Sequence, residues 1–188
     1  MSDHGFSCTC GTLRGTISGA GIKSGTHLIC HCRDCRAGEL FLGQSDPGQN
    51  GVAMVQTMPD AVTLTQGADK LGLLRLSKKG PYRWFATCCN APLFNTLSSA
   101  KLPFASLSAA RLDDPARLGP VRVRAFVPQP GGGTKHKGAA IMAWRLFTNM
   151  GSARLSGRWK STPFFDDSGA PVAKAVMPDK AERAAFYP

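Results

Sequence analysis

Short apolar segments separated by turn residues run through the first two thirds of the chain. Residues 12–18 alternate apolar and polar positions, with Leu13 and Ile17 on the same side as Gly15. Further apolar segments occupy residues 52–58, 61–65, 71–76, 82–86 and 102–107. Alternation and short length are typical of strands bounded by Gly, Pro and Asp turns. The pattern predicts a mainly β fold of small antiparallel sheets, without β-α-β units.

The pattern changes after one last predicted strand at residues 121–127, whose arginines should face outward. A Pro- and Gly-rich connector at 128–133 precedes a predicted helix over 139–150 that ends near Gly151. We expect a tail after Pro163 that is extended or partly disordered. One apolar stripe of the helix should be buried against the β domain or a second copy of the chain; it comprises Ala139, Met142, Ala143, Leu146, Phe147 and Met150.

These changes predict a β domain over residues 1–127 and a C-terminal helical appendage over 128–188 that is not a domain of its own. The chain has 188 residues, of which 43% are hydrophobic and 19% charged, as expected for a folded protein. The N-terminus lacks a secretory pattern, and no apolar run approaches the roughly 20 residues that span a bilayer. We therefore expect a soluble, cytoplasmic protein without a membrane partner.

Positive charge is concentrated in the second half of the chain. The net charge is +11, and residues 97–188 carry 14 Lys and Arg against 6 acidic residues. A basic half can contact an acidic partner such as nucleic acid. No recognisable nucleic-acid-binding motif accompanies the charge, so nucleic acid is not the expected partner.

The seven cysteines carry the candidate chemistry, and all of them lie in the first half of the chain. Their odd number and their clustering at separations of one or two residues, without an export signal, favour metal binding over disulfides. Small buried hydrophobes are the other interpretation. The cysteines are Cys8, Cys10, Cys30, Cys32, Cys35, Cys88 and Cys89.

The spacing divides the cysteines into two groups. Cys30, Cys32 and Cys35 can converge on one zinc ion, whose fourth position is either open, as in catalytic sites, or closed by a distant residue. His31 lies between two of these ligands, so its side chain should point away from the ion. The pairs 8/10 and 88/89 can together form a closed structural site of four thiolates.

The three cysteine motifs resemble those of the glutathione-dependent formaldehyde-activating enzyme family, which includes centromere protein V-like members. Residues 8–11 look like the family's Cys-x-Cys-Gly, residues 30–36 like Cys-His-Cys-x-x-Cys-Arg, and residues 85–93 like Phe-Cys-x-x-Cys-Gly-x-Pro-Leu. The similarity covers about residues 6–127. It implies an Mss4-like zinc fold with two zinc ions per chain, a structural one at the outer pairs and a catalytic one at Cys30, Cys32 and Cys35.

Two departures from the family pattern matter. Ala86 stands where the first cysteine of the later pair is expected, and Cys88 is the nearest replacement. Three outcomes are open: a four-thiolate site, a three-cysteine site completed by water, or no zinc there. The region after Val127 does not resemble the family's compact ending, and residues that bind glutathione cannot be assigned.

The resemblance implies a zinc-dependent carbon–sulfur lyase-type enzyme that acts on a glutathione-like thiol adduct of a small aldehyde. The alternative is a non-catalytic, zinc-stabilised binding module whose basic C-terminal half contacts an acidic partner. A homodimer is compatible with either hypothesis.

Overall fold

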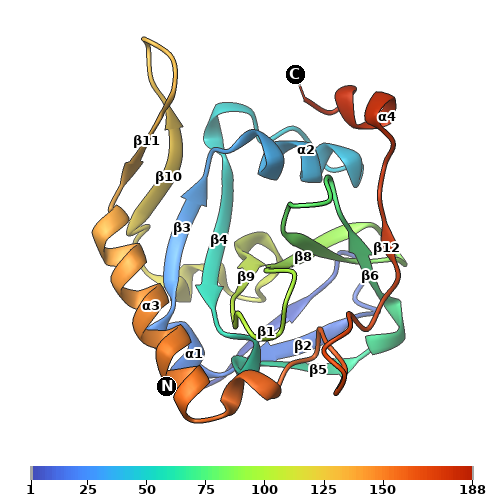
Figure 1. Cartoon of the computed structure of the whole chain (residues 1–188), viewed down its shortest axis with the longest axis vertical. Helices are drawn as coiled ribbons and strands as arrows, with labels where there is room; N and C mark the ends of the chain where they lie inside the picture. Colours follow the sequence, from blue (N-terminus) through green and yellow to red (C-terminus); the bar gives the residue numbers. More distant parts are fainter. Residues whose placement is uncertain (1, 188) are drawn as a thin grey trace.

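The computed structural model describes residues 2–187 and is mainly β, as the sequence pattern predicts (Figure 1). Met1, the first residue of the predicted β domain (1–127), and Pro188, the last residue of the predicted appendage (128–188), lie outside the described residues. A smaller sheet contains β1 (His4–Ser7), β2 (Arg14–Ile17) and β5 (Val62–Gln66), in that order. All of its pairings are antiparallel.

The larger sheet has nine strands. These strands are β3 (Thr26–Cys30), β4 (Val52–Thr57), β6 (Leu71–Leu74), β7 (Tyr82–Ala86), β8 (Ala91–Thr96), β9 (Ala105–Ser108), β10 (Val123–Pro128), β11 (Thr134–Lys137) and β12 (Ala175–Val176). Their order across the sheet is β11-β10-β3-β4-β9-β8-β7-β6-β12.

Two pairings in the larger sheet are parallel, and the others are antiparallel, as the sequence pattern predicts. β10 runs parallel to β3, with Val123 opposite Leu28, and β12 runs parallel to β6, with Ala175 opposite Leu73. Each parallel strand returns to an outer position of the sheet after a long excursion of the chain. Local alternation does not reveal such long-range pairings.

Within residues 2–187, four α-helices accompany the sheets: α1 (Gly19–Ser24), α2 (Arg33–Phe41), α3 (Ala139–Leu155) and α4 (Lys180–Ala184). The Ser18 hydroxyl caps α1 by accepting a hydrogen bond from the Gly21 amide at 3.1 Å. The Cys32 sulfur caps α2 in the same way. Within residues 2–187, none of these helices combines the length and the apolar character that crossing a membrane requires.

The main core lies between the two sheets. Leu13, Gly15 and Ile17 are all buried on one side, as the alternation predicted. Phe6 of β1 meets Phe94 of β8 with ring centroids 5.1 Å apart in an edge-to-face arrangement. Such pairs add stability beyond the buried area, so the aromatic contact fastens the small sheet to the large one.

The C-terminal tail is part of this core, so of the two expected alternatives, extended or partly disordered, partial disorder does not apply to its first residues. Phe164 is fully buried, with its ring centroid 5.3 Å from Trp84 and 5.1 Å from Phe94. Further along, β12 extends the large sheet, and Phe186 packs on Phe41 of α2 with ring centroids 5.3 Å apart. Figure 1 shows α4 lying beside α2, far along the chain from it.

The predicted helix exists, but its length and its buried face differ from the prediction. α3 continues past Gly151 to Leu155 and lies along the outside of the molecule beside α1 (Figure 1). Phe147, expected to be buried, is 71% exposed. The helix is held partly by polar contacts: Arg145 donates to the Gly25 carbonyl and Asn149 donates to the Ser24 carbonyl at 3.0 Å. Ala139 is also exposed, whereas Met142, Ala143, Leu146 and Met150 are half-buried.

Candidate metal centres

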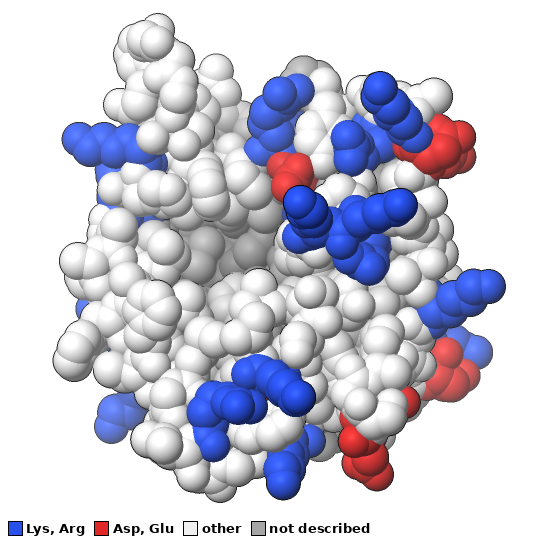
Figure 2. All heavy atoms as spheres, viewed as in Figure 1, with Lys and Arg blue, Asp and Glu red and all other residues white. Residues whose placement is uncertain are grey.

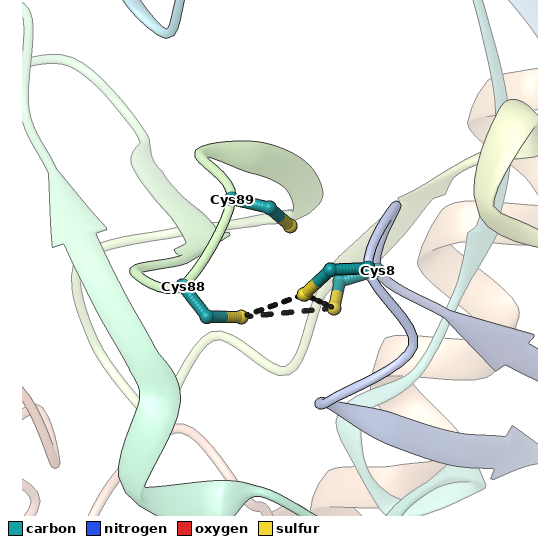
Figure 3. A group of neighbouring side chains, drawn as sticks. Cys8, Cys88 and Cys89 are labelled. Carbon is teal, nitrogen blue, oxygen red and sulfur yellow. Dashed lines mark hydrogen bonds between the residues drawn. The ribbon is translucent and has the colours of Figure 1, made fainter.

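The first group joins two segments that are about 80 residues apart in sequence. Cys8 and Cys10 lie in the turn after β1, and Cys88 and Cys89 lie in the turn between β7 and β8. Figure 3 shows the side chains of Cys8, Cys88 and Cys89 pointing toward one another. Their four Sγ atoms all lie within 4.8 Å of one another. Cys8 and Cys10 are 3.5 Å apart, and the Sγ of Cys88 is 3.8 Å from that of Cys8 and 3.4 Å from that of Cys10.

These distances fit a metal site and exclude disulfides. Four thiolates about 2.3 Å from a tetrahedral zinc ion lie about 3.8 Å from each other. A disulfide would bring two sulfurs to about 2.05 Å, and all seven cysteines are free. The sulfurs are therefore grouped at the separation that a metal ion requires.

A tight turn over residues 87–90 lets two adjacent cysteines reach one point. Cys89 donates its backbone amide to the Ala86 carbonyl at 3.3 Å, and Asn90 adopts a left-handed conformation with φ of 54°. In a strand, neighbouring side chains would point to opposite faces. The turn removes that constraint, while Ala86, the position where the family pattern has a cysteine, ends β7 fully buried in the core.

In the turn after β1, both sulfurs lie within hydrogen-bond distance of polar groups of the chain. The Leu13 amide donates to the Cys8 Sγ at 3.3 Å, and Gly11 turns the chain with φ of 74°. The Thr12 hydroxyl, 3.2 Å from the Cys10 sulfur, is the main reason that the pKa of Cys10 falls to about 6. A lowered pKa favours the thiolate, which is the form that binds metal.

The second group is built where β3 leads into α2. Cys30 ends the strand, Cys32 caps the helix and Cys35 lies in its first turn. Their Sγ atoms lie within 4.8 Å of one another, with Cys30 and Cys32 3.3 Å apart. Among residues 2–187, no further His, Cys, Asp or Glu joins this group. His31 is therefore outside it, as the sequence predicted.

The second group holds negative charge on one sulfur. Contact with Cys30, and then with Cys35, lowers the pKa of Cys32 strongly. Contact with Cys32 raises the pKa of Cys30 to about 11, although contact with Cys35 acts in the opposite direction. Contacts with Cys30 and Cys32, and then burial, raise the pKa of Cys35 further. The positive end of the α2 dipole also favours a thiolate at this position. Without metal, the Cys32 thiolate is thus stabilised by contact with the protonated thiols of Cys30 and Cys35. A bound cation would favour loss of the remaining protons.

Sequence reasoning missed the polar residues around the second group. Cys35 lines a small cavity together with Glu39 of α2, Arg83 of β7 and Asn95 of β8. Arg83 stands between Tyr82 and Trp84 in an otherwise apolar strand and is only 7% exposed. An arginine inside an apolar strand was the available signal, because a buried charge requires a partner.

The fold and the two groups define a mainly β protein with two cysteine groups that could hold metal ions. The chain belongs to the family of unknown function DUF6151, whose model matches residues 2–176. It also resembles the crystal structure of a Rhodobacter sphaeroides protein solved as a structural-genomics target. That similarity has 18% identity and a TM-score of 0.43, over 62% of this chain and 96% of that one. No curated protein matches the chain.

Proposed function

We propose that this protein is a zinc enzyme that joins a thiol to a small aldehyde, or reverses that reaction, as a carbon–sulfur lyase does. Cys30, Cys32 and Cys35 hold the catalytic zinc in this proposal. Cys8, Cys10, Cys88 and Cys89 hold a structural zinc. The observation that carries the proposal is the difference between the two groups, four sulfurs in one and three in the other.

The difference in ligand number matches the division between structural and catalytic zinc. Structural sites are closed by four protein ligands, whereas catalytic sites use three and keep one position for a substrate or water. Sulfur-only ligand sets favour zinc over hard cations such as magnesium or calcium. The similarity of residues 8–11, 30–36 and 85–93 to the formaldehyde-activating family supports the same assignment.

In this proposal, the second group binds and activates a thiol. When bound, zinc supplies a Lewis acid that stabilises a thiolate or polarises a carbonyl oxygen. Cys30 is 7% exposed, so one side of the group is shielded from water. The N-terminus of α2 points its amides at the sulfurs, with the Cys35 amide 3.3 Å from the Cys32 Sγ, and so stabilises negative charge on the group.

A kinetic measurement by NMR tests the reaction directly. Protein loaded with two zinc ions is mixed with ¹³C-formaldehyde and each of several thiols, including glutathione and cysteine, and the rate of hydroxymethyl-thiol formation is measured by NMR. We expect acceleration over the uncatalysed rate for at least one thiol. Cys35→Ser should abolish it, whereas Cys10→Ser, in the other group, should retain turnover in the folded fraction. A two-zinc protein that accelerates none of the thiols would refute the proposal.

A second candidate function rests on the distribution of charge, since Lys and Arg predominate over Asp and Glu on the face drawn in Figure 2. Residues 115–165 contain nine Lys and Arg and no acidic residue. This segment includes β10, β11 and α3, which lie together along one side of the molecule (Figure 1). A non-catalytic module that binds an acidic partner through this side would show affinity that falls steeply with salt. Binding of a polyanion such as heparin at 50 and 300 mM salt, without thiol–aldehyde turnover, would favour this candidate.

A further inference from the structure

Arg83 is a buried cation that crosses α2 next to the three-cysteine group. It is 7% exposed and lines the same cavity as Cys35. Its side chain passes directly over Gly38, where an added Cβ would lie 3.2 Å from the Arg83 Cδ and 3.3 Å from its Nη1. Glycine at this position of the helix thus leaves room for the guanidinium.

The protein supplies hydrogen-bond acceptors for only part of this guanidinium group. Its Nη1 donates to the Asn95 Oδ1 at 3.2 Å, and its buried Nε has no hydrogen-bond partner within residues 2–187. Arg83 also takes part in none of the ion pairs in this part of the chain. A buried cation is costly unless an anion and hydrogen-bond acceptors compensate it. The side chain is therefore positioned for an acceptor that the chain does not supply.

The space beside Arg83 limits the size of that acceptor. The cavity has a volume of about 20 Å³, which is room for one water-sized group. Besides Cys35 and Arg83, its polar lining includes Glu39, Asn95 and Ser108. Burial raises the pKa of Glu39, and the charges of Arg111 and Arg83 oppose this shift. The cavity therefore combines a cation with a carboxyl group that burial makes more basic.

We propose that this cavity binds one small oxyanion through Arg83, beside the metal position of the three-cysteine group. The inference rests on the proposed function, in which the bound group is the oxygen of the attacked carbonyl. The carbon–sulfur bond forms as the π pair of the carbonyl moves to oxygen, and the proton given up by the thiol ends on that oxygen. The step needs no oxidant or reductant. Formate serves as a probe of the same place, with one of its oxygens in the cavity beside Arg83.

A simpler role for Arg83 makes a different prediction. Three thiolates and one divalent ion carry a net charge of −1, which Arg83 could balance as a counter-ion. A counter-ion alone requires neither an unpartnered Nε nor an adjoining cavity. It also gives no saturable response to a small anion, so anion binding separates the two roles.

Formate binding to cobalt-loaded full-length protein tests the proposal. Cobalt bound to thiolates absorbs visible light, and formate is titrated at constant ionic strength, with neutral formamide as a control of the same shape. We expect a saturable spectral change with formate and not with formamide, and a rise in melting temperature. Arg83→Gln should weaken formate binding at least tenfold. Lys101→Gln, at an exposed lysine between β8 and β9, makes the same change of charge and should bind as the wild type does.

A second variant covers the case in which Arg83→Gln fails to fold. Gly38→Ala keeps the charge and displaces the guanidinium, and should weaken formate binding several-fold. The proposal is wrong if the metal-loaded wild type shows no saturable response, if formamide acts equally, or if a folded Arg83→Gln or Gly38→Ala protein binds as the wild type does. Because binding is read without turnover, formate binding in a protein that accelerates no thiol addition would refute the reaction and leave the oxyanion site standing.

Discussion

The backbone amide of Cys35 lies 3.3 Å from the sulfur of Cys32 and donates a hydrogen bond to it. One cysteine therefore caps the helix that carries another. The cap replaces the Ser, Thr, Asp or Asn that usually begins a helix. This arrangement couples the start of α2 to the three-cysteine group, because a change in the sulfur also changes the first turn of the helix.

Metal analysis should find two zinc ions per chain. Protein purified without chelator and with reduced thiols should contain close to two equivalents by elemental analysis, since two cysteine groups lie at metal-binding separations. Cys35→Ser should contain close to one, because its group then has only two thiolates. A zinc content near zero in the reduced wild type would contradict both metal sites.

Single substitutions should show whether both adjacent cysteines of the first group bind the ion. The sulfurs of Cys88 and Cys89 both lie within 4.8 Å of those of Cys8 and Cys10. We expect Cys88→Ser and Cys89→Ser each to lose one zinc ion and to lower the melting temperature. Loss of zinc only in Cys89→Ser would show that Cys88 is not a ligand.

Phe164 should be essential for stability although it lies near the end of the chain. Phe164→Ala removes a fully buried ring between Trp84 and Phe94 and should lower the free energy of unfolding by about 3–5 kcal/mol. The matched control is Phe147→Ala on α3, which is 71% exposed and should change stability by less than about 0.5 kcal/mol. Urea unfolding of both variants measures the difference. Equal effects would show that the tail does not enter the core.

Tyr187 should lose its phenolic proton at a higher pH than an ordinary tyrosine does. Burial, followed by the hydrogen bond to Asp34 at 2.5 Å, raises the pKa of Tyr187 to about 12, above the usual value of about 10. The folded state thus keeps a proton that the unfolded state releases. This contribution to stability is complete below pH 10 and is lost as the pH rises through 12.

Absorbance at 295 nm can follow this proton, because the chain has two tyrosines. In Tyr82→Phe protein the whole signal belongs to Tyr187, and Asp34→Asn added to it should move the midpoint down toward 10. A midpoint near 10 with Asp34 intact would show that the C-terminal residues do not pack on α2.

Sequence reasoning predicted the parts of the fold that are local. The alternation around Leu13 and Ile17 identified a real strand face, and the predicted strand over 82–86 coincides with β7. The turn over 87–90 that brings Cys88 and Cys89 together was also predictable, because Asn and Pro favour turns. In each case the determining interactions lie within a few residues.

The missed features depend on contacts across the chain. β3, β8 and the two parallel pairings were not predicted, since long-range pairing leaves no local period. Helix periodicity overestimated the burial of Phe147, because polar contacts from Arg145 and Asn149 also set how α3 lies on its neighbours. The cavity at Arg83 could not be predicted either, because it depends on the contact between α2 and β7, which are distant in sequence and meet only in the folded protein.

The two cysteine groups close loops of very different length, and this gives them different places in folding. Cys30 and Cys35 are five residues apart, whereas Cys8 and Cys88 are separated by 80. Closing the longer loop costs about 2.5 kcal/mol more chain entropy, as (3/2)RT ln n. An ion could therefore bind the nascent 30–35 segment early, while the Cys8–Cys88 group must wait for the β7–β8 hairpin to reach β1. Once formed, a metal ion there ties distant parts of the chain together as a cross-link, and its release by a chelator should speed global unfolding.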